Sequence, residues 1–261
     1  MINLLFLFVS FLASIVGSIC GIGGGVIIKP VLDSFGILDV KTISFLSGCT
    51  VLSMSTYNVL ISKIKNESHI NLTTVTPLAI GAAIGGVVGK NLFQILIRAY
   101  EQNLVGATQA GILVLITLGT LIYTLYKKNI QTHQIQNIFI LLIVGFILGI
   151  LSSFLGIGGG PINLVVLFFF FSMPTKIAAQ SSLYIILFSQ ITSLLNTLVT
   201  KTVPSFDLIL LILMVCGGVL GAYYGRKINL KINEKRVEQL FIGIMGVIIL
   251  VNVYNMIKFL A

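Results

Sequence analysis

The pentapeptide Gly-Ile-Gly-Gly-Gly occurs twice in the chain, at residues 21–25 and again at residues 156–160, and it decides the fold. Each copy interrupts a long apolar stretch. Glycine is a poor helix former and leaves its backbone amides uncovered. The pentapeptide therefore predicts a break in a hydrophobic helix, followed by a short apolar piece that ends near residue 35 in one case and near residue 171 in the other.

The two copies belong to a longer internal similarity. At their offset of 135 residues, Lys41 aligns with Lys176 and Ser47 with Ser182. Four more positions recur at an offset of 136, namely Gly81, Gly85, Gly89 and Lys90 as Gly217, Gly221, Gly225 and Arg226. The four-residue spacing of these glycines predicts close helix packing. The similarity predicts two tandem membrane repeats, residues 1–128 and 129–261, within one transmembrane domain.

The composition is typical of a protein embedded in a lipid bilayer. The chain is 57% hydrophobic and 9% charged, with a mean hydropathy of +1.09, whereas roughly a quarter of the residues of soluble domains are charged. Uncharged runs such as 42–62, 102–126 and 129–175 reach the ~20 residues that a spanning helix needs. They do not alternate apolar and polar residues as β-barrel strands do. We predict an all-α integral membrane protein, a polytopic helical bundle.

The path of the chain at the breaks decides how the two halves are related. If each break follows a full crossing, the protein has about eight spanning helices and the halves are parallel. If the chain turns back there, it has six spanning helices plus two re-entrant or broken elements at the glycine motifs, and the halves are inverted. Inversion is favoured, because substrate sites between inverted repeats recur among transporters.

The net charge of +9 does not indicate nucleic-acid binding, because the basic residues are scattered at the edges of apolar runs. Their one cluster lies in residues 226–236, and the positive-inside rule assigns this loop to the cytoplasm and the C-terminus to the outside. The first apolar run lacks the basic start of a signal peptide, so we expect it in the mature fold. We expect a multi-pass protein of the bacterial plasma membrane.

The glycine breaks are also the first candidates for chemistry. In hydrocarbon, freed amides are tolerated where they face a cavity or a ligand, and the start of the following helix is an anion site. Close packing is the alternative role of these glycines. On this basis we predict that the substrate contacts Gly23, Gly24, Gly25, Gly158, Gly159 and Gly160.

Polar side chains within the apolar spans complete the predicted site. Hydroxyls and amides donate hydrogen bonds without fixed charge, which suits an anion that must also leave, although single Ser and Thr residues often bond their own helix. The predicted set is Ser47, Thr50, Asn58, Asn163, Gln180, Ser181, Ser182 and Gln190. Three lysines, Lys29, Lys41 and Lys176, are placed to attract an anion or to reach lipid headgroups.

Enzymatic chemistry is not indicated. All seven acids lie near loops or span ends, so we predict no carboxylate deep in a span, and His69 and His133 lie in loops. Cys20, Cys49 and Cys216 lack metal-ligand spacing. We therefore predict no catalytic residue, metal or cofactor. The predicted function is a secondary carrier or uniporter for a small anion; the alternatives are a channel-like anion pore and an intramembrane enzyme.

Three segments give the chain a family resemblance: residues 21–32, residues 156–163, and residues 176–183, which read Lys-Ile-Ala-Ala-Gln-Ser-Ser-Leu. It resembles the sulfite exporter TauE/SafE family. The resemblance implies transport of sulfite, thiosulfate or an organosulfonate, most simply its export, without a cofactor. Its expected partners are the small anion, membrane lipids and a second copy in a homodimer. Ser181-Ser182 match the family pattern, whereas the first half reads Leu46-Ser47 and lacks the paired hydroxyl.

Overall fold

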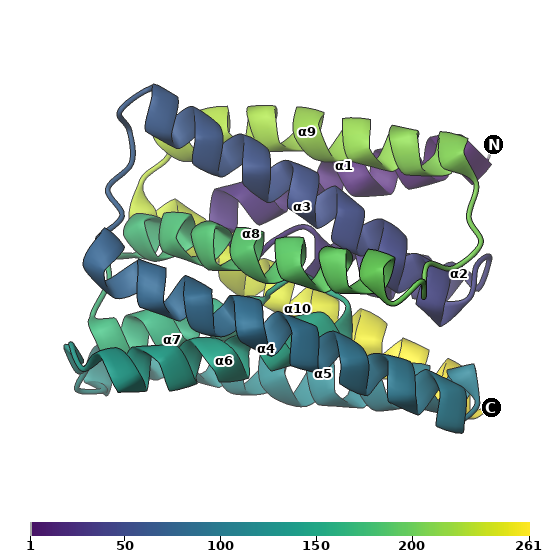
Figure 1. The fold of residues 1–261 in the computed structure, drawn as a ribbon. Coiled ribbons are helices and arrows are strands. Elements are labelled where there is room, and N and C mark those ends of the chain that lie inside the picture. Colours follow the sequence, from purple (N-terminus) through teal and green to yellow (C-terminus); the bar gives the residue numbers. More distant parts are fainter. Residues whose placement is uncertain (1) are drawn as a thin grey trace.

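The computed structural model describes residues 2–261, and within this range the chain forms ten α-helices, one short 3₁₀ turn and no β-strand (Figure 1). The first half comprises α1 (Ile2–Cys20), α2 (Gly25–Phe35), α3 (Val40–Ile64), α4 (Leu72–Ala99) and α5 (Gln102–Tyr126), followed by the turn η1 (Lys127–Asn129). The second half comprises α6 (Ile138–Leu155), α7 (Pro161–Phe171), α8 (Thr175–Val199), α9 (Leu208–Lys231) and α10 (Glu234–Leu260).

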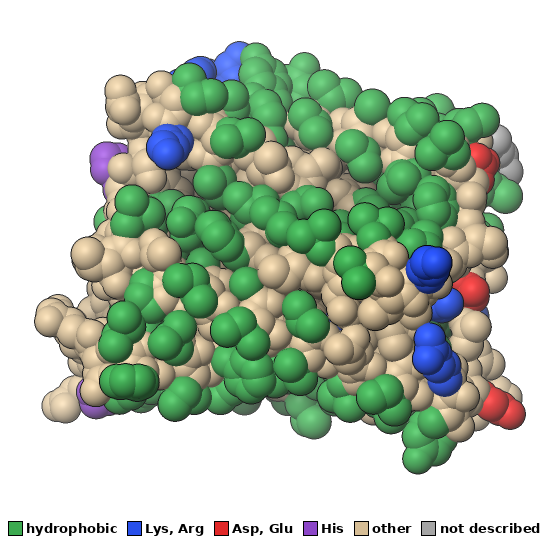
Figure 2. Space-filling model, viewed as in Figure 1, with side chains coloured by type: hydrophobic (Ala, Val, Ile, Leu, Met, Phe, Trp, Pro, Cys, Tyr) green, Lys and Arg blue, Asp and Glu red, His purple; other side chains and the backbone are tan. Residues whose placement is uncertain are grey.

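Eight of the ten helices are long and apolar enough to cross a membrane, and each has between 18 and 28 residues. At 1.5 Å per residue, even the shortest approaches the ~30 Å of a hydrocarbon core. Leu115 of α5 and Leu250 of α10 are 71% and 72% exposed, as lipid-facing side chains are. Figure 2 shows hydrophobic side chains across the middle of one face, with charged residues toward its two ends. The prediction of an all-α membrane protein is confirmed.

The two short helices, α2 and α7, turn the chain back after each glycine break. The end of α2 lies beside the end of α10, where Lys258 Nζ donates to the Ser34 carbonyl at 2.9 Å. Both chain termini lie at this end of the molecule, which we call the N/C end (Figure 1). At the other end, called the opposite end, Ser172 after α7 donates to the His133 carbonyl just before α6. Each pair, α1–α2 and α6–α7, is therefore a re-entrant hairpin.

The two hairpins enter from opposite ends of the bundle. The α1–α2 hairpin begins and finishes at the N/C end, whereas the α6–α7 hairpin begins and finishes at the opposite end (Figure 1). Three long helices then cross the bundle in each half. Of the two chain paths that the sequence allows, the structure has the inverted one.

The two glycine ladders bring helices into backbone contact. A β-carbon on Gly81, Gly85 or Gly89 of α4 would lie 2.1–2.3 Å from a carbonyl oxygen of α6. The glycines of α9 pack on α1 in the same way, and the two sets of contacts correspond at offsets of 135 and 136 residues. These paired contacts agree with a duplicated chain, while the division into repeats at residue 128 stays a prediction.

Substitution at the middle of one ladder tests this packing. Gly85→Ala places a methyl group 2.1 Å from the Phe146 carbonyl oxygen, so α4 and α6 must separate. We expect a loss of about 1–3 kcal/mol of stability, the usual cost of overpacking, measured as a lower Tm of the purified protein. Gly119→Ala is the matched control, since no atom lies within 4 Å of its β-carbon position. Equal Tm values for both variants would contradict the ladder.

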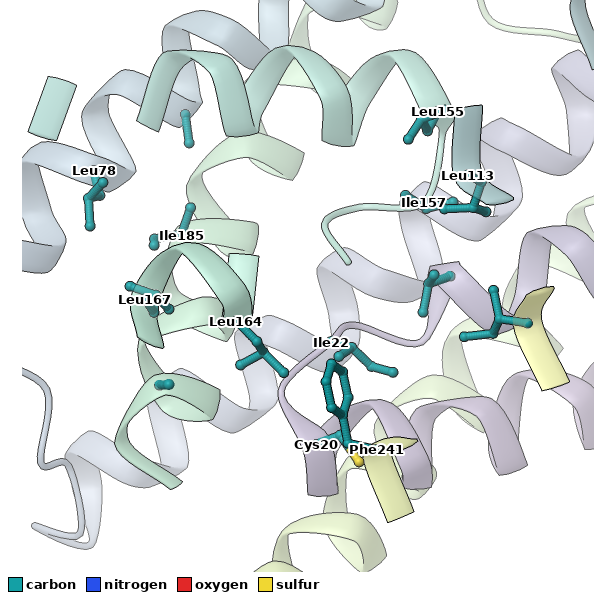
Figure 3. Packing of buried hydrophobic residues seen from close by; sticks show 14 of the residues in the cluster. Cys20, Ile22, Leu78, Leu113, Leu155, Ile157, Leu164, Leu167, Ile185 and Phe241 are labelled. Carbon is teal, nitrogen blue, oxygen red and sulfur yellow. The ribbon is translucent and has the colours of Figure 1, made fainter. Parts of the chain in front are cut away.

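The isoleucine of each pentapeptide anchors its break in the core. Ile22 is 0% exposed and Ile157 is 2% exposed. Both belong to one large cluster of buried side chains contributed by most of the helices, including Leu113 of α5 and Phe241 of α10 (Figure 3). The glycines supply the turn and the isoleucine supplies the apolar anchor, so the whole pentapeptide fixes where the chain reverses.

Candidate functional site

The two glycine breaks meet in the interior, and we call this region the glycine junction (residues 21–25 and 156–160). A β-carbon on Gly25 would lie 2.1 Å from the Ile157 carbonyl oxygen, and one on Gly23 would lie 3.8 Å from the Gly158 carbonyl oxygen. Gly23 and Gly158, which are equivalent at the offset of 135, have φ values of 75° and 72°. L side chains rarely adopt this left-handed conformation, so both positions require glycine.

The junction also joins the first turns of two helices. Helix α2 starts at Gly25 and α7 starts at Pro161, and the two run from the junction toward opposite ends of the bundle. The positive ends of both helix dipoles therefore face the junction. Asn163, in the first turn of α7, is 1% exposed, and its Oδ1 has no hydrogen-bond partner among the described residues. Its Nδ2 lies 3.4 Å from the β-carbon position of Gly159.

A small apolar cluster covers the junction on one side. Val51 of α3 lies 2.5 Å from the β-carbon position of Gly158, and Ile186 of α8 lies 2.3 Å from that of Gly159. These two side chains form a buried cluster with Met54, Leu183 and Ala222, which we call the apolar plug. In this structure Gly158 and Gly159 are therefore packed against aliphatic side chains.

The predicted polar residues of α3 and α8 are buried around the junction, and they differ in whether their side chains have a hydrogen-bond partner. The hydroxyls of Ser47, Ser181 and Ser182 are 0% exposed and have no hydrogen-bond partner among the described residues. The Gln190 Oε1 atom lies 3.2 Å from the β-carbon position of Gly48. In contrast, Thr50 donates to the Leu46 carbonyl of its own helix at 2.9 Å. Buried hydroxyl groups without a hydrogen-bond partner destabilise a protein unless a water molecule or a ligand accepts their hydrogen bonds.

A pocket with both polar and apolar walls opens at the opposite end of the molecule. Its polar lining consists of Ser18, Asn58, Ser62, Lys176, Gln180, Arg226 and Asn229. Ala179, also in its wall, packs against Gly21, while Leu183 belongs to the apolar plug. The pocket therefore reaches the first glycine break and ends at the plug. Its cavity volume is ≈ 30 Å³, about the space that one water molecule takes up in the liquid, so a larger anion could enter only after the pocket widens.

The sequence analysis missed four polar residues of the pocket, namely Ser18, Ser62, Arg226 and Asn229. Arg226 was missed because it was assigned to the cytoplasmic loop. It lies in α9 and is 9% exposed. Its guanidinium group donates to the Ser62 hydroxyl and to the carboxylate of Glu67, with which it forms an ion pair. Its alignment with Lys90, directly after a glycine ladder, was the signal that could have placed it inside the bundle.

Two predicted amides help to build this pocket. Asn58 Nδ2 donates to Ser18 Oγ at 2.7 Å and so links α3 to α1. Gln180 accepts a hydrogen bond from the His69 amide at 3.1 Å and donates to the Glu67 carbonyl. Gln180 thereby holds the loop that carries the carboxylate partner of Arg226.

The three predicted lysines lie in separate places. Lys176 is half-buried and lines the pocket, whereas Lys41 is half-buried at the start of α3, at the N/C end. Lys29 is buried and forms a 2.6 Å ion pair with Asp33, one turn along α2. Asp33 is 6% exposed and lies two residues before the end of α2, so this acid is near the end of its helix, as predicted, but it is also buried.

The buried pair of α2 is expected to be structural. Lys29→Ala would leave the Asp33 carboxylate buried without its partner, which costs about 3–5 kcal/mol, and thermal unfolding of the purified protein would show it as a large drop in Tm. Lys235→Ala, at an exposed lysine, is the control. The double variant Lys29→Met, Asp33→Leu removes both charges and should recover most of the lost Tm. If the Tm did not recover, the pair would have a further role besides the mutual neutralisation of its two charges.

Eight long apolar helices, two of which belong to re-entrant hairpins, and a pocket with two basic residues at one end are the features of a multi-pass membrane transporter. The chain belongs to the sulfite exporter TauE/SafE family, whose profile matches residues 6–252, so the resemblance seen in the glycine motifs is confirmed.

Two relatives are also described as transporters. The probable membrane transporter protein MJ0441 of Methanocaldococcus jannaschii is 26% identical over 255 residues, which cover 93% of this chain and 92% of the relative. The probable membrane transporter protein YunE of Bacillus subtilis is 23% identical over 263 residues, covering 92% of this chain and 91% of the relative. No solved structure matches the chain. These descriptions agree with a transporter and name no enzyme activity.

Proposed function

We propose that this transporter is a carrier that exports a small sulfur oxyanion, with sulfite as the first candidate. The observation that carries the proposal is the pocket in which Arg226 and Lys176 stand above the first glycine break. The description of the family as sulfite exporters supports the substrate class. A guanidinium group matches the geometry of oxyanions because it donates two parallel hydrogen bonds.

The pocket offers both charge and neutral donors to such an anion. Arg226 supplies the guanidinium, and the Gln180 amide and the hydroxyls of Ser18 and Ser62 line the same space. Asn58 also lines it, but its Nδ2 already donates to Ser18 Oγ and to the Met54 carbonyl. Arg226 already holds the carboxylate of Glu67. An incoming oxyanion would replace this carboxylate on the guanidinium, so binding would free the Glu67 side chain, while Gln180 still holds the backbone of the loop between α3 and α4.

Passage beyond the pocket requires the apolar plug to move. The plug separates the pocket from the junction, where the first turns of α2 and α7 meet and where Ser47, Ser182 and Asn163 keep uncommitted polar atoms. In our proposal these groups bind the anion midway, once Val51 and Ile186 withdraw. A pocket closed at its inner end favours a carrier over a continuously open pore.

We propose that the opposite end faces the cytoplasm of a bacterial cell. The basic residues Arg226, Lys227, Lys231, Lys235 and Arg236 lie there, as the positive-inside rule expects, and the C-terminus lies at the other end (Figure 1). With a negative cell interior, each anionic charge that leaves gains about 2.3 kcal/mol per 100 mV. Export would therefore need no coupling ion.

Ligand-induced stabilisation of the purified protein tests the proposal. A ligand at 100 times its Kd adds about 2.7 kcal/mol to the stability of the state that binds it, so sulfite or thiosulfate should raise the Tm by several degrees. Sulfate and taurine, tested in parallel, separate inorganic oxyanions from organosulfonates, and chloride at equal ionic strength is the control. If none of the four sulfur compounds raised the Tm above chloride, the proposed substrate class would be wrong.

A further inference from the structure

Lys90 of α4 is a buried basic residue to which the proposed path assigns no role. It is 5% exposed, and its ammonium nitrogen lies 5.1 Å from the centroid of the Phe93 ring. The ion pairs among the described residues involve Lys29, Lys127 and Arg226 and do not include Lys90. A buried ammonium group without a carboxylate partner is unfavourable. An aromatic ring offsets this only partly, so Lys90 is suited to receive an anion.

The position of Lys90 matches that of Arg226 in the other half of the chain. Lys90 follows Gly89, which packs on Ile150 of α6, and Arg226 follows Gly225, which packs on Ile15 of α1. Because the hairpins enter from opposite ends, Lys90 lies on the N/C side of the junction and Arg226 on the opposite side. The second basic residue of the pocket, Lys176, also has a counterpart, Lys41, at the N/C end.

Polar residues of α4 and α8 flank the position of Lys90, although the ammonium group itself lies over the Phe93 ring. Gly86, one turn before Lys90, packs on Ser189 of α8, and Asn91 accepts a 2.7 Å hydrogen bond from Asn196. The polar stretch of α8 between these two contacts therefore lies beside Lys90, and it includes the buried Ser193.

The correspondence extends to the hydroxyl and amide groups of the pocket. Ser18, Asn58 and Ser62, which line the pocket, are 5%, 5% and 6% exposed. Their counterparts at the offset of 135 are Ser153, Ser193 and Thr197, which are 3%, 5% and 1% exposed. One position differs, because the counterpart of Glu67 is Thr202. A threonine side chain has no carboxylate that could form an ion pair with Lys90 in place of the anion.

We propose that Lys90 is the basic residue of a second anion site, which takes the sulfur oxyanion when the carrier opens at the N/C end. This inference rests on the proposed function, and it supplies the release side of the same path. Lys90 is 5% exposed, so in our proposal the anion reaches it only after the N/C end opens. Because Lys90 has no carboxylate competitor at the position of Glu67, the anion itself neutralises the ammonium when it arrives.

Transport measured separately from each side tests the role of Lys90. Wild-type protein, Lys90→Gln and Lys90→Arg are reconstituted in phosphatidylcholine vesicles, and access of trypsin to the 226–236 loop gives their sidedness. For Lys90→Gln we expect the KM for sulfite presented at the N/C end to rise tenfold or more, with an unchanged KM at the opposite end. Lys90→Arg should restore part of the loss. Arg98→Gln, which removes an exposed charge from the same helix, is the control.

Stability and ligand binding separate this role from the alternatives. Lys90→Met removes the unpaired charge and should leave the Tm unchanged or higher, and sulfite should still raise the Tm of Lys90→Gln through the Arg226 pocket. A marked fall in the Tm of Lys90→Met would assign Lys90 a structural role and overturn the inference, as would unchanged KM values at both sides. If the KM of Lys90→Gln at the N/C end rose only in vesicles that contain anionic lipid, a lipid phosphate would be the ligand of Lys90 instead. Absence of sulfite transport by the wild type would reject the proposed function itself.

Discussion

Replacing Arg226 with glutamine is expected to weaken sulfite binding by about 10- to 100-fold. A hydrogen bond to a charged group contributes about 1.5–3 kcal/mol, and each 1.4 kcal/mol is a factor of ten in Kd. Arg226 is the residue of the pocket that combines a full charge with a buried position, since Lys176 is only half-buried. The measurement is the sulfite concentration that gives half of the maximal rise in Tm.

The neighbours of Arg226 supply the controls for this experiment. Lys227→Gln removes the same charge one residue along, from an exposed side chain, and should leave binding within a factor of two. Glu67→Gln removes the competing carboxylate and should tighten binding about tenfold, by the same energy scale. If Arg226→Gln and Lys227→Gln had equal effects, only the overall charge of this end would matter, and the pocket would not be the binding site.

Adding one methyl group at the glycine junction is expected to slow transport about 100-fold. In Gly25→Ala the new β-carbon would lie 2.1 Å from the carbonyl oxygen of Ile157, so the start of α2 must move away from the second break. Overpacking by one methyl group costs about 3 kcal/mol at its upper range. If this cost falls on the conformations that carry the anion, the rate drops about 100-fold. Uptake of labelled sulfite by reconstituted vesicles measures it.

Two other glycines show whether this effect is specific to the meeting point of the breaks. Gly23→Ala would mainly strain the backbone, because its β-carbon would meet the flexible end of Ile186 at 3.3 Å, so we expect a smaller loss of transport. Gly243→Ala places its methyl group in open space and should transport at the wild-type rate. Wild-type transport by Gly25→Ala would show that the two breaks need not touch during the cycle.

Much of the fold could be predicted because membrane constraints act on local sequence. Uncharged runs of sufficient length predict the helices, and Gly-Ile-Gly-Gly-Gly predicts where two of them break, as the structure has them. The choice between parallel and inverted halves could not be made with certainty in this way. It depends on whether the piece after each break returns to the same end, which is a tertiary property fixed by contacts such as that between Ser172 and His133.

The candidate site was less predictable because its parts are distant in sequence. Glu67 reaches Arg226 across 159 residues, and no local pattern reveals this contact. The plug that Val51 and Ile186 form over the glycines is equally invisible, since both look like ordinary lipid-facing residues in the sequence. The Lys29–Asp33 pair, in contrast, has the spacing of four residues that joins neighbouring turns of a helix, so it could have been recognised from the sequence.

Counterflow of labelled sulfite in reconstituted vesicles tests the central claim most directly. Vesicles loaded with unlabelled sulfite and diluted into a trace of labelled sulfite should accumulate the label transiently, with saturable kinetics, if a carrier exchanges one anion for another. Vesicles that contain Arg226→Gln should accumulate far less. Uptake no greater than that of protein-free vesicles would contradict sulfite transport, and uptake that never saturates and shows no overshoot would replace the carrier with a pore.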